Sequence, residues 1–178
     1  TRLELAIRQV PLARITLQRW RTLAPDSPGV LQASAWIALS EGNADRAFAE
    51  LEAMAQPDPK GDWRSIAQVL IGAEDKEQAA VLLARLTTPE HLGESDQNWI
   101  AMSQLAFKLG DKALANRLSE SAMTRFQSVD AYAWSAQLAL DDENKALARK
   151  RFAEALKRDP ESLRLRTGYA ALIAETGD

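Results

Sequence analysis

The chain has 178 residues, of which 46% are hydrophobic and 26% are charged, and its formal net charge is −3. A chain of this size can bury a sizeable core, and its mild acidity gives no reason to expect nucleic acid or an anionic membrane as a partner. The sequence contains no cysteine, which excludes disulfides and thiolate metal sites. It also contains no apolar run of the roughly 18 residues that a membrane-spanning helix needs.

Helical periodicity is present from the first residues. Residues 2–9 have the pattern of the end of a helix whose beginning is not in the sequence. Pro11 suits the first turn of a second helix, which is expected to run to about Leu23, because the missing N–H of proline costs nothing there. Ala13 and Leu17 form the apolar face of this helix.

Capping and turn residues predict the next helix pair. Ser27 is expected to cap a helix over residues 28–41, which has proline at its first position. Gly42 permits a left-handed turn, and Asn43 is expected to cap a second helix over residues 44–54.

The second and third pairs follow the same scheme. Asp62 and Asp75 are expected to cap helices over residues 62–71 and 76–86. Residues 87–95 are expected to form a loop. The third pair is predicted over residues 96–109 and 112–126.

Residues 129–160 show the repeated unit most clearly. Apolar or small residues recur at three- and four-residue intervals on both helices, which gives each helix one face to bury. Two such faces this close in sequence are expected to pack against each other as an antiparallel pair. Pro160 ends the second helix because it restricts Asp159 and has no N–H, and a lone helix over residues 161–175 follows. The two faces consist of Tyr132, Ala136 and Ala139, and of Ala148, Phe152 and Ala155.

The unit recurs with a constant period. Pro25 and Pro59 close helices one unit of about 34 residues apart, and Pro160 closes another three units later. An alanine follows each turn between paired helices, and four residues further stands a residue that is apolar in all but one unit. A helix–turn–helix unit of this period is typical of tetratricopeptide repeats (TPR), and the chain resembles that family over nearly its whole length. The residues concerned are Ala47, Ala79, Ala115 and Ala148, and then Leu51, Leu83, Ser119 and Phe152.

The resemblance implies an all-α fold, namely a right-handed superhelix of antiparallel helix pairs (a TPR-like α-solenoid). We expect one array over residues 1–178, with the poorest match at residues 60–95. Trp63 and Trp99 stand at the position that TPR units reserve for a large core residue. Trp20 stands where alanine is usual, so the adjoining helix must be displaced or shaped to accept an indole. The expected repeats are a half repeat 1–27, full repeats 28–59, 60–95, 96–128 and 129–162, and a half repeat 163–178.

The first helix of each TPR pair lines the concave groove, so the resemblance implies that its non-core residues meet a ligand. Trp36 and Trp134 are rotated toward this side, where an indole offers rigid contact area and an N–H donor; alternatively, each fills a gap between repeats. Gln68, Gln104 and Gln137 hold equivalent places and either bind an extended backbone or are solvated. The expected partner-binding residues are Gln32, Trp36, Arg64, Gln68, Gln104, Lys108, Trp134, Gln137, Asp141 and Arg164.

The charges in this set bear on the kind of ligand. Arg64 and Lys108 favour an acidic or C-terminal residue. TPR proteins that hold chaperone tails do so with a lysine and asparagines at defined groove positions, and this clamp is not reproduced here. The matching positions hold Gln32, Arg64 and Ile100, and Trp36, Gln68 and Gln104.

Sites for catalysis or cofactors are hard to find in the sequence. His91 is the only histidine and is interpreted as a solvated loop residue. The acidic run 141–143 lacks the alternating oxygen ligands of a calcium loop. The basic residues in 145–158 are interpreted as a solvated helix surface. We therefore expect no enzyme, no cofactor and no metal.

The function that these features favour is a non-catalytic scaffold that binds a protein or peptide, with no nucleic acid and no membrane insertion by this chain. The alternative is an accessory segment of a larger bacterial envelope-assembly, polysaccharide-export or transferase protein. Cytoplasm and bacterial periplasm fit the sequence equally well. Because the helix from Leu163 to Ile173 is too apolar for a terminal cap, we expect the chain to continue past Asp178 and its open half repeats to self-associate.

Overall fold

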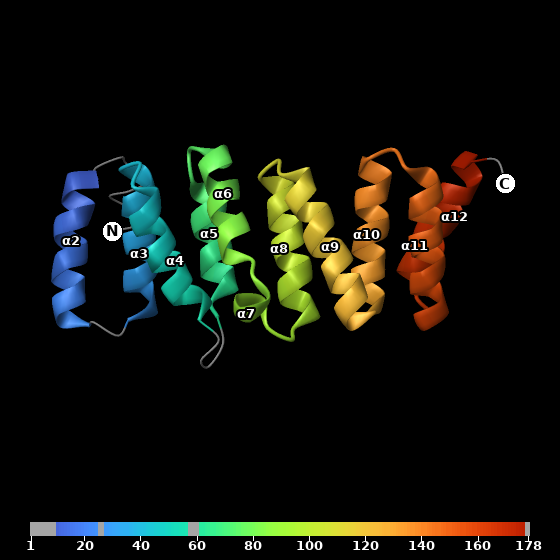
Figure 1. The fold of residues 1–178 in the computed structure, drawn as a ribbon, viewed down its shortest axis with the longest axis horizontal. Coiled ribbons are helices and arrows are strands. Elements are labelled where there is room, and N and C mark those ends of the chain that lie inside the picture. Colours follow the sequence, from blue (N-terminus) through green and yellow to red (C-terminus); the bar gives the residue numbers. More distant parts are fainter. Residues whose placement is uncertain (1–9, 25–26, 57–60, 177–178) are drawn as a thin grey trace. The chain divides into compact units, whose positions relative to one another are not determined.

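The computed structural model describes residues 10–24, 27–56 and 61–176, and every regular element within them is a helix (Figure 1). Each helix predicted from Pro11 onward is present close to its expected bounds, whereas the helix predicted over residues 2–9 lies outside the described residues. The helices are α2 (Val10–Leu23), α3 (Pro28–Ser40), α4 (Ala44–Ala55), α5 (Trp63–Gly72), α6 (Lys76–Leu86), α7 (Pro89–Leu92), α8 (Asp96–Lys108), α9 (Lys112–Phe126), α10 (Val129–Asp141), α11 (Lys145–Arg158) and α12 (Leu163–Thr176).

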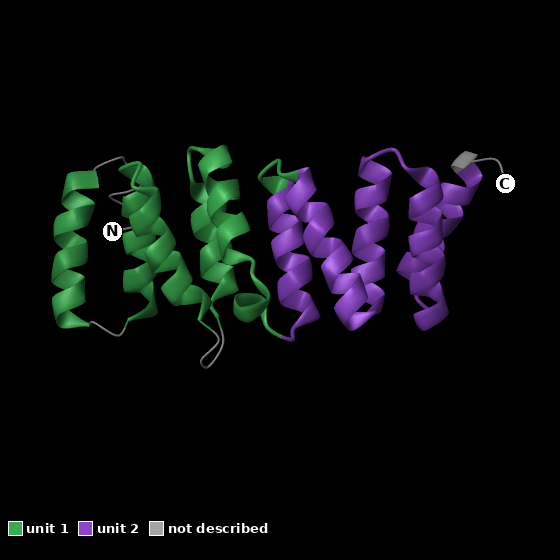
Figure 2. Cartoon of the chain, viewed as in Figure 1, with its two compact units in different colours: residues 1–93, 108–111 green, residues 94–107, 112–178 purple. Residues whose placement is uncertain are grey.

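The chain divides into two compact units, which Figure 2 shows in different colours. Unit 1 comprises residues 1–93 and 108–111, and unit 2 comprises residues 94–107 and 112–178. In unit 1, α2 packs on α3, α3 on α4, and α5 on α6; in unit 2, α9 packs on α10, α10 on α11, and α11 on α12. Three of the expected antiparallel pairs are therefore in contact, namely α3 with α4, α5 with α6 and α10 with α11. The repeat bounds and the single continuous array remain predictions.

Small residues allow the paired helices to approach closely. The four alanines that follow the turns between paired helices are fully buried, with exposed fractions of 0%. The residues four positions after them are also buried, including the polar Ser119 and the aromatic Phe152. Both parts of the predicted core pattern are confirmed.

The core of unit 2 extends from α10 through α11 to α12. Ala136, Ala148 and Phe152 belong to one buried cluster together with Leu165 and Leu172 of α12. Two of the apolar residues that made α12 too apolar for a terminal cap are therefore buried inside unit 2. Another, Leu163, is 76% exposed, and self-association through this end remains a prediction.

The contact between α2 and α3 depends on a glycine. A Cβ at Gly29 would lie 2.6 Å from Cη2 of Trp20. The indole of Trp20 is half-buried against the cluster that contains Ala13, Leu17 and Ile37. The prediction that the adjoining helix is shaped to accept this indole is confirmed.

Most of the predicted turn chemistry is present. The side chains of Asn43, Asp62 and Asp75 each accept a hydrogen bond from a backbone N–H in the first turn of the helix that follows. Gly42 has a φ of 70°, the left-handed conformation that glycine adopts without strain. Ser27, in contrast, makes no side-chain cap.

The failure of the Ser27 cap has a local cause. The N–H of Val30, one of the two that a capping side chain at position 27 could accept, donates to the backbone carbonyl of Ser27 at 2.9 Å instead. The side chain of Ser27 is therefore left without the donor that a capping serine usually accepts.

The predicted loop over residues 87–95 contains the one-turn helix α7. The only histidine in this loop was predicted to be a solvated loop residue, and this prediction is wrong. His91 is half-buried, and its Nδ1 lies 3.0 Å from the carbonyl oxygen of Leu86. His91 therefore ties α7 to the end of α6.

Candidate partner-binding surfaces

In unit 1, the predicted groove residues lie on α3 and α5, the first helices of their pairs. Gln32 is buried on α3, and its Nε2 donates to Oε1 of Gln68 on α5 at 3.1 Å. Arg64 and Gln68 are exposed on α5. The structure thus brings Gln32 and Gln68 together, and part of their hydrogen-bonding capacity is used within the protein.

Trp36 is half-buried on α3, and its six-membered ring covers Gly72 at the end of α5. A Cβ at Gly72 would lie 3.0 Å from Cζ2 of this indole. Nε1 of Trp36 is buried and has no hydrogen-bond partner among the described residues. The N–H donor that was expected to serve a ligand is therefore inaccessible, and what Trp36 presents is its ring, which lines a pocket of about 330 Å³.

In unit 2, residues of α8, α10, α11 and α12 line a groove of about 510 Å³. Four of the predicted partner-binding residues line it, namely Gln104, Trp134, Gln137 and Arg164. The other lining residues were not predicted to meet a ligand. They are Gln97, Ile100, Ala101, Asp130, Ala133, Phe152, Leu165 and Gly168.

Several residues that line this groove were not predicted from the sequence to do so. Phe152, on α11, was assigned to the core alone, whereas it also lines the groove beside Gly168. Gln97 could have been found from spacing, since it lies one turn before Ile100 and two turns before Gln104 on the same face of α8. A glycine within the apolar helix α12 was a further signal, because glycine there weakens a helix unless packing requires it.

Trp134 is held in place by unit 2 itself. Its Nε1 donates to Oγ of the buried Ser103 at 2.7 Å, and Ser103 in turn donates to the carbonyl oxygen of Ala115 at 2.6 Å. The ring of Phe107 meets the indole edge-on, with the centroids 6.0 Å apart. The N–H of Trp134 is therefore occupied, and the half-buried indole offers a ligand only its ring.

Asp141 and Lys108 do not line either hollow. Asp141 accepts a hydrogen bond from Lys112, and this bond is the main cause of the raised pKa of the Lys112 ammonium. Lys108 is exposed at the end of α8. Their part in partner binding remains a prediction.

The last predicted residue, Arg164, forms an ion pair with Asp130 at the edge of the groove. Nη2 of Arg164 lies 3.4 Å from Oδ1 of Asp130, and both side chains are largely exposed. Such an exposed pair contributes little to stability. It does neutralise the two charged residues that line the groove.

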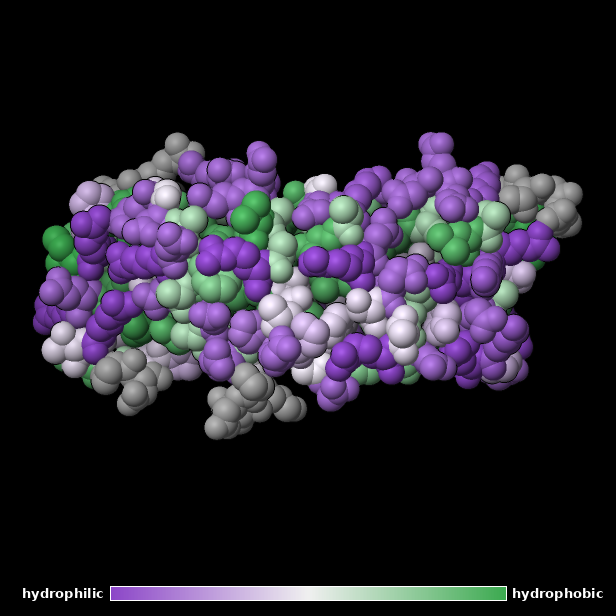
Figure 3. All heavy atoms as spheres, viewed as in Figure 1, coloured by the Kyte–Doolittle hydropathy of each residue, from purple (hydrophilic) through white to green (hydrophobic). Residues whose placement is uncertain are grey.

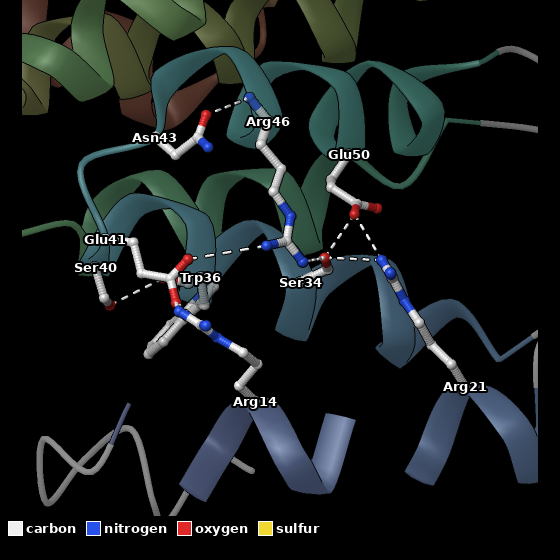
Figure 4. Close-up of polar contacts among 9 residues, drawn as sticks. All are labelled: Arg14, Arg21, Ser34, Trp36, Ser40, Glu41, Asn43, Arg46 and Glu50. Atoms are coloured by element: carbon white, nitrogen blue, oxygen red, sulfur yellow. Dashed lines mark hydrogen bonds and ion pairs between the residues drawn. The ribbon is translucent and has the colours of Figure 1, made fainter. Parts of the chain in front are cut away.

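A polar network ties α2, α3 and α4 together in unit 1 (Figure 4). The fully buried Ser34 donates to Glu50 at 2.5 Å, and Arg21 donates to both of these side chains. Glu41 accepts ion pairs from Arg14 on α2 and Arg46 on α4. Because these charges are paired with one another, the network is structural.

The surface carries no dominant apolar area on the face drawn in Figure 3, where apolar side chains of the described residues form small separate areas among hydrophilic ones. Within the same residues, no helix combines the length and apolar character needed to cross a bilayer. No cluster of three or more histidine or acidic residues with metal-binding geometry occurs among them either.

Comparison with known proteins supports the fold. The chain is similar to the crystal structure of a thermophilic TPR protein from Thermus thermophilus, with a TM-score of 0.54 and 20% sequence identity. The similarity covers 97% of this chain and 96% of that one. No family model and no curated protein sequence matches the chain. The fold is therefore an all-helical, TPR-like α-solenoid, as the repeat period predicted.

Proposed function

We propose that the protein is a non-catalytic scaffold that binds an extended segment of a partner protein in the groove of unit 2. TPR-like folds bury their cores in helix pairs and leave the faces of the first helices for recognition. The groove lined by α8, α10, α11 and α12 is the larger of the two hollows described above.

The observation that carries this proposal is the arrangement of polar and apolar groups in the groove. Gln104 and Gln137 are exposed on α8 and α10, and Gln97 adds a third exposed amide. Each amide offers both donors and an acceptor, which an extended backbone can use on both its N–H and C=O groups. The apolar residues that line the groove beside these amides include Ala101, Ala133 and Phe152.

The charge of the groove indicates what kind of segment fits. Among the described residues, the only charged ones that line it are Asp130 and Arg164, and they are paired. We therefore expect a segment that is neutral where it lies in the groove and that places an apolar side chain against Phe152. The preference of Arg64 and Lys108 for an acidic residue concerns residues outside this groove.

The residues predicted on α3 and α5 form a proposed second contact surface, in unit 1. It comprises the exposed Arg64 and Gln68, with Gln32 beside Gln68 and the ring of Trp36 further along α3. Two of these residues, Arg64 and Trp36, are of types that are enriched at binding hot spots.

A matched pair of substitutions tests the proposal. Ala101 is exposed and lines the groove, so Ala101→Arg would fill it with little effect on the core. Ala170 is equally exposed on α12 and does not line the groove, so Ala170→Arg is the control. Peptides would be selected from a displayed random library on the wild-type chain, and their affinities measured by calorimetry for all three proteins.

Selected peptides should bind Ala101→Arg about tenfold more weakly or worse, since loss of the groove contacts should cost at least about 1.4 kcal/mol. They should bind Ala170→Arg as they bind the wild type, and circular dichroism should give all three proteins similar melting temperatures. Equal affinities for Ala101→Arg and the wild type would show that partners bind elsewhere.

The alternative, an accessory segment of a larger envelope-assembly, export or transferase protein, is a proposal about what else the gene encodes. The gene sequence on both sides of residues 1–178 tests it directly. A transferase, channel or outer-membrane domain in the same reading frame would support it, and its absence would leave the scaffold alone.

A further inference from the structure

Three of the described glycines lie within helices, where glycine weakens a helix relative to alanine. They are Gly29 in α3, Gly72 in α5 and Gly168 in α12. None of the three has a positive φ, so the backbone conformation does not require glycine at these positions. What distinguishes glycine there is therefore the space that the missing side chain leaves.

At two of these glycines, a tryptophan of the protein itself takes up that space. A Cβ at Gly29 would lie 2.6 Å from the ring of Trp20, and a Cβ at Gly72 would lie 3.0 Å from the ring of Trp36. Both distances are shorter than an ordinary van der Waals contact. In unit 1, a helical glycine thus makes room for an aromatic ring twice.

The surroundings of Gly168 are different. A Cβ there would lie 3.6 and 3.7 Å from Cε1 and Cζ of Phe152, which are ordinary contact distances. Apart from its own helix, no other described residue comes within 4 Å of that position. Packing inside unit 2 therefore does not account for this glycine. Because Gly168 lines the groove, the space beside it belongs to the groove.

The neighbouring indole does not take up this space either. Trp134 holds the place of Gly168 one repeat earlier in the chain, Ala101 holds it two repeats earlier, and all three residues line the groove. The indole of Trp134 is committed to α8, where its N–H donates to Ser103 and its ring meets that of Phe107. The groove is therefore left open on the α12 side of the indole, at Gly168.

We propose that Gly168, Phe152 and Trp134 form a subsite of the groove that binds an aromatic side chain of the partner segment, and that Gly168 determines this specificity. The far end of the Phe152 ring lies beside Gly168, so an incoming ring can meet it edge to face, as aromatic pairs prefer. The charged residues that line the groove, Asp130 and Arg164, are paired with each other, which favours an uncharged side chain. This inference rests on the proposed function and adds the side chain that the groove selects.

The test fills the subsite without disturbing the helix that carries it. Gly168→Leu places a side chain in the groove, and Ala170→Leu is the matched control, because Ala170 is exposed on the same helix and does not line the groove. Leucine is a much better helix former than glycine, so Gly168→Leu should resist urea at least as well as the wild type. The probes are the peptides selected on the wild-type chain, together with versions in which each aromatic residue is replaced by alanine.

One aromatic residue of each peptide should be an anchor, whose replacement weakens binding to the wild type about tenfold or more in calorimetry. Gly168→Leu should bind the unchanged peptides about tenfold more weakly, and replacing the anchor should then have little further effect, because both changes remove the same contact. Ala170→Leu should bind like the wild type. Loss of affinity without loss of stability separates the subsite from a structural role.

A milder variant covers the case in which Gly168→Leu is less stable than the wild type. Gly168→Ala adds one methyl group at an ordinary contact distance from Phe152, and it should weaken the peptides about fivefold while α12 becomes more stable.

Wild-type affinity in both Gly168 variants, a full effect of anchor replacement in Gly168→Leu, or selected peptides without a shared aromatic anchor would each overturn the subsite. If Ala101→Arg still weakens binding in these cases, the groove remains the binding site and only the subsite is wrong. If Ala101→Arg and Gly168→Leu both bind like the wild type, both proposals are wrong.

Discussion

Ser103 links a predicted binding residue to the core of unit 2. Its Oγ accepts the N–H of Trp134 and donates to the carbonyl of Ala115, so both functions of the hydroxyl are used. Three equivalent positions in the other first helices, Ala35, Ala67 and Ala136, hold alanine. Alanine therefore fits sterically at position 103, and its substitution there isolates the effect of the hydrogen bonds.

We predict that Ser103→Ala lowers the free energy of unfolding by about 1–3 kcal/mol, because the N–H of the half-buried Trp134 loses its acceptor. Urea unfolding measures this change, and the Nε1–H signal of Trp134 should move. Ser121→Ala is the control, since that hydroxyl donates to the carbonyl of Arg117 within its own helix. A loss no larger than the control's would mean that the hydrogen bond to Trp134 contributes nothing.

Two helical glycines should respond in opposite directions to alanine. At Gly168, a Cβ would lie 3.6 Å from Cε1 of Phe152, an ordinary contact, so Gly168→Ala should stabilise α12 by roughly 0.5–1 kcal/mol. At Gly29, the same Cβ would lie 2.6 Å from the packed indole of Trp20, so Gly29→Ala should destabilise unit 1 by about 1–3 kcal/mol. Urea midpoints measure both changes, and shifts of the same sign would contradict the packing described here.

The tryptophans show which roles of single residues can be predicted from the sequence and which cannot. Trp63 and Trp99 were predicted to be core residues from their place in the repeat, and they are buried. The contacts of Trp134 could not be predicted in the same way, because its acceptor Ser103 lies one repeat earlier in the chain. A serine hydroxyl among alanines gives no periodic signal, and its partner is decided by side-chain geometry.

At the scale of helices, α11 connects the groove to the core of unit 2. Phe152 belongs to the buried cluster of α10, α11 and α12 and also lines the groove. Arg158 near the end of the same helix donates to the carbonyl of Gln127 at 2.8 Å and lies over the ring of Tyr132. α11 thus contacts both α10 and α12, two of the helices that line the groove.

Phe152→Ala should therefore weaken both stability and binding. Truncating a buried phenylalanine costs about 3–5 kcal/mol, and we expect a value near the lower end because the cavity would open into the groove. Urea unfolding gives the stability, and the peptides selected on the wild type give the affinity. Phe152→Leu is the control that should retain most of the stability. Full stability in Phe152→Ala would show that this face of α11 is not part of the core.

Helix bounds followed from local chemistry, which is why most of them were predictable. Prolines, glycines and capping side chains act within a few residues of their own position, and Asn43, Asp62 and Asp75 behave accordingly. The helix α7 was missed because four residues are too few to show a period. The groove was only partly predicted, since α11 and α12 also contribute apolar residues to it, Phe152 and Leu165, and not only the first helices α8 and α10.

At the scale of the whole molecule, the relevant property is that each repeat contacts mainly its neighbours. In repeat proteins, stability is approximately a sum of local terms, so a substitution is felt mainly in the repeats that touch it. The helices of this chain pack on the helices next to them in sequence, and the contacts divide into two compact units. Local opening in one unit should therefore depend little on substitutions in the other.

Hydrogen exchange of the native protein tests this expectation with two substitutions already described. Gly29→Ala should speed amide exchange in α2 and α3 of unit 1, and Phe152→Ala should speed it in α10, α11 and α12 of unit 2, because local opening free energies fall where packing is lost. Exchange in the other unit should stay close to that of the wild type in each case. If either substitution instead speeds exchange equally in all helices, the chain opens as one cooperative body, and a ligand held in one unit would then stabilise the other.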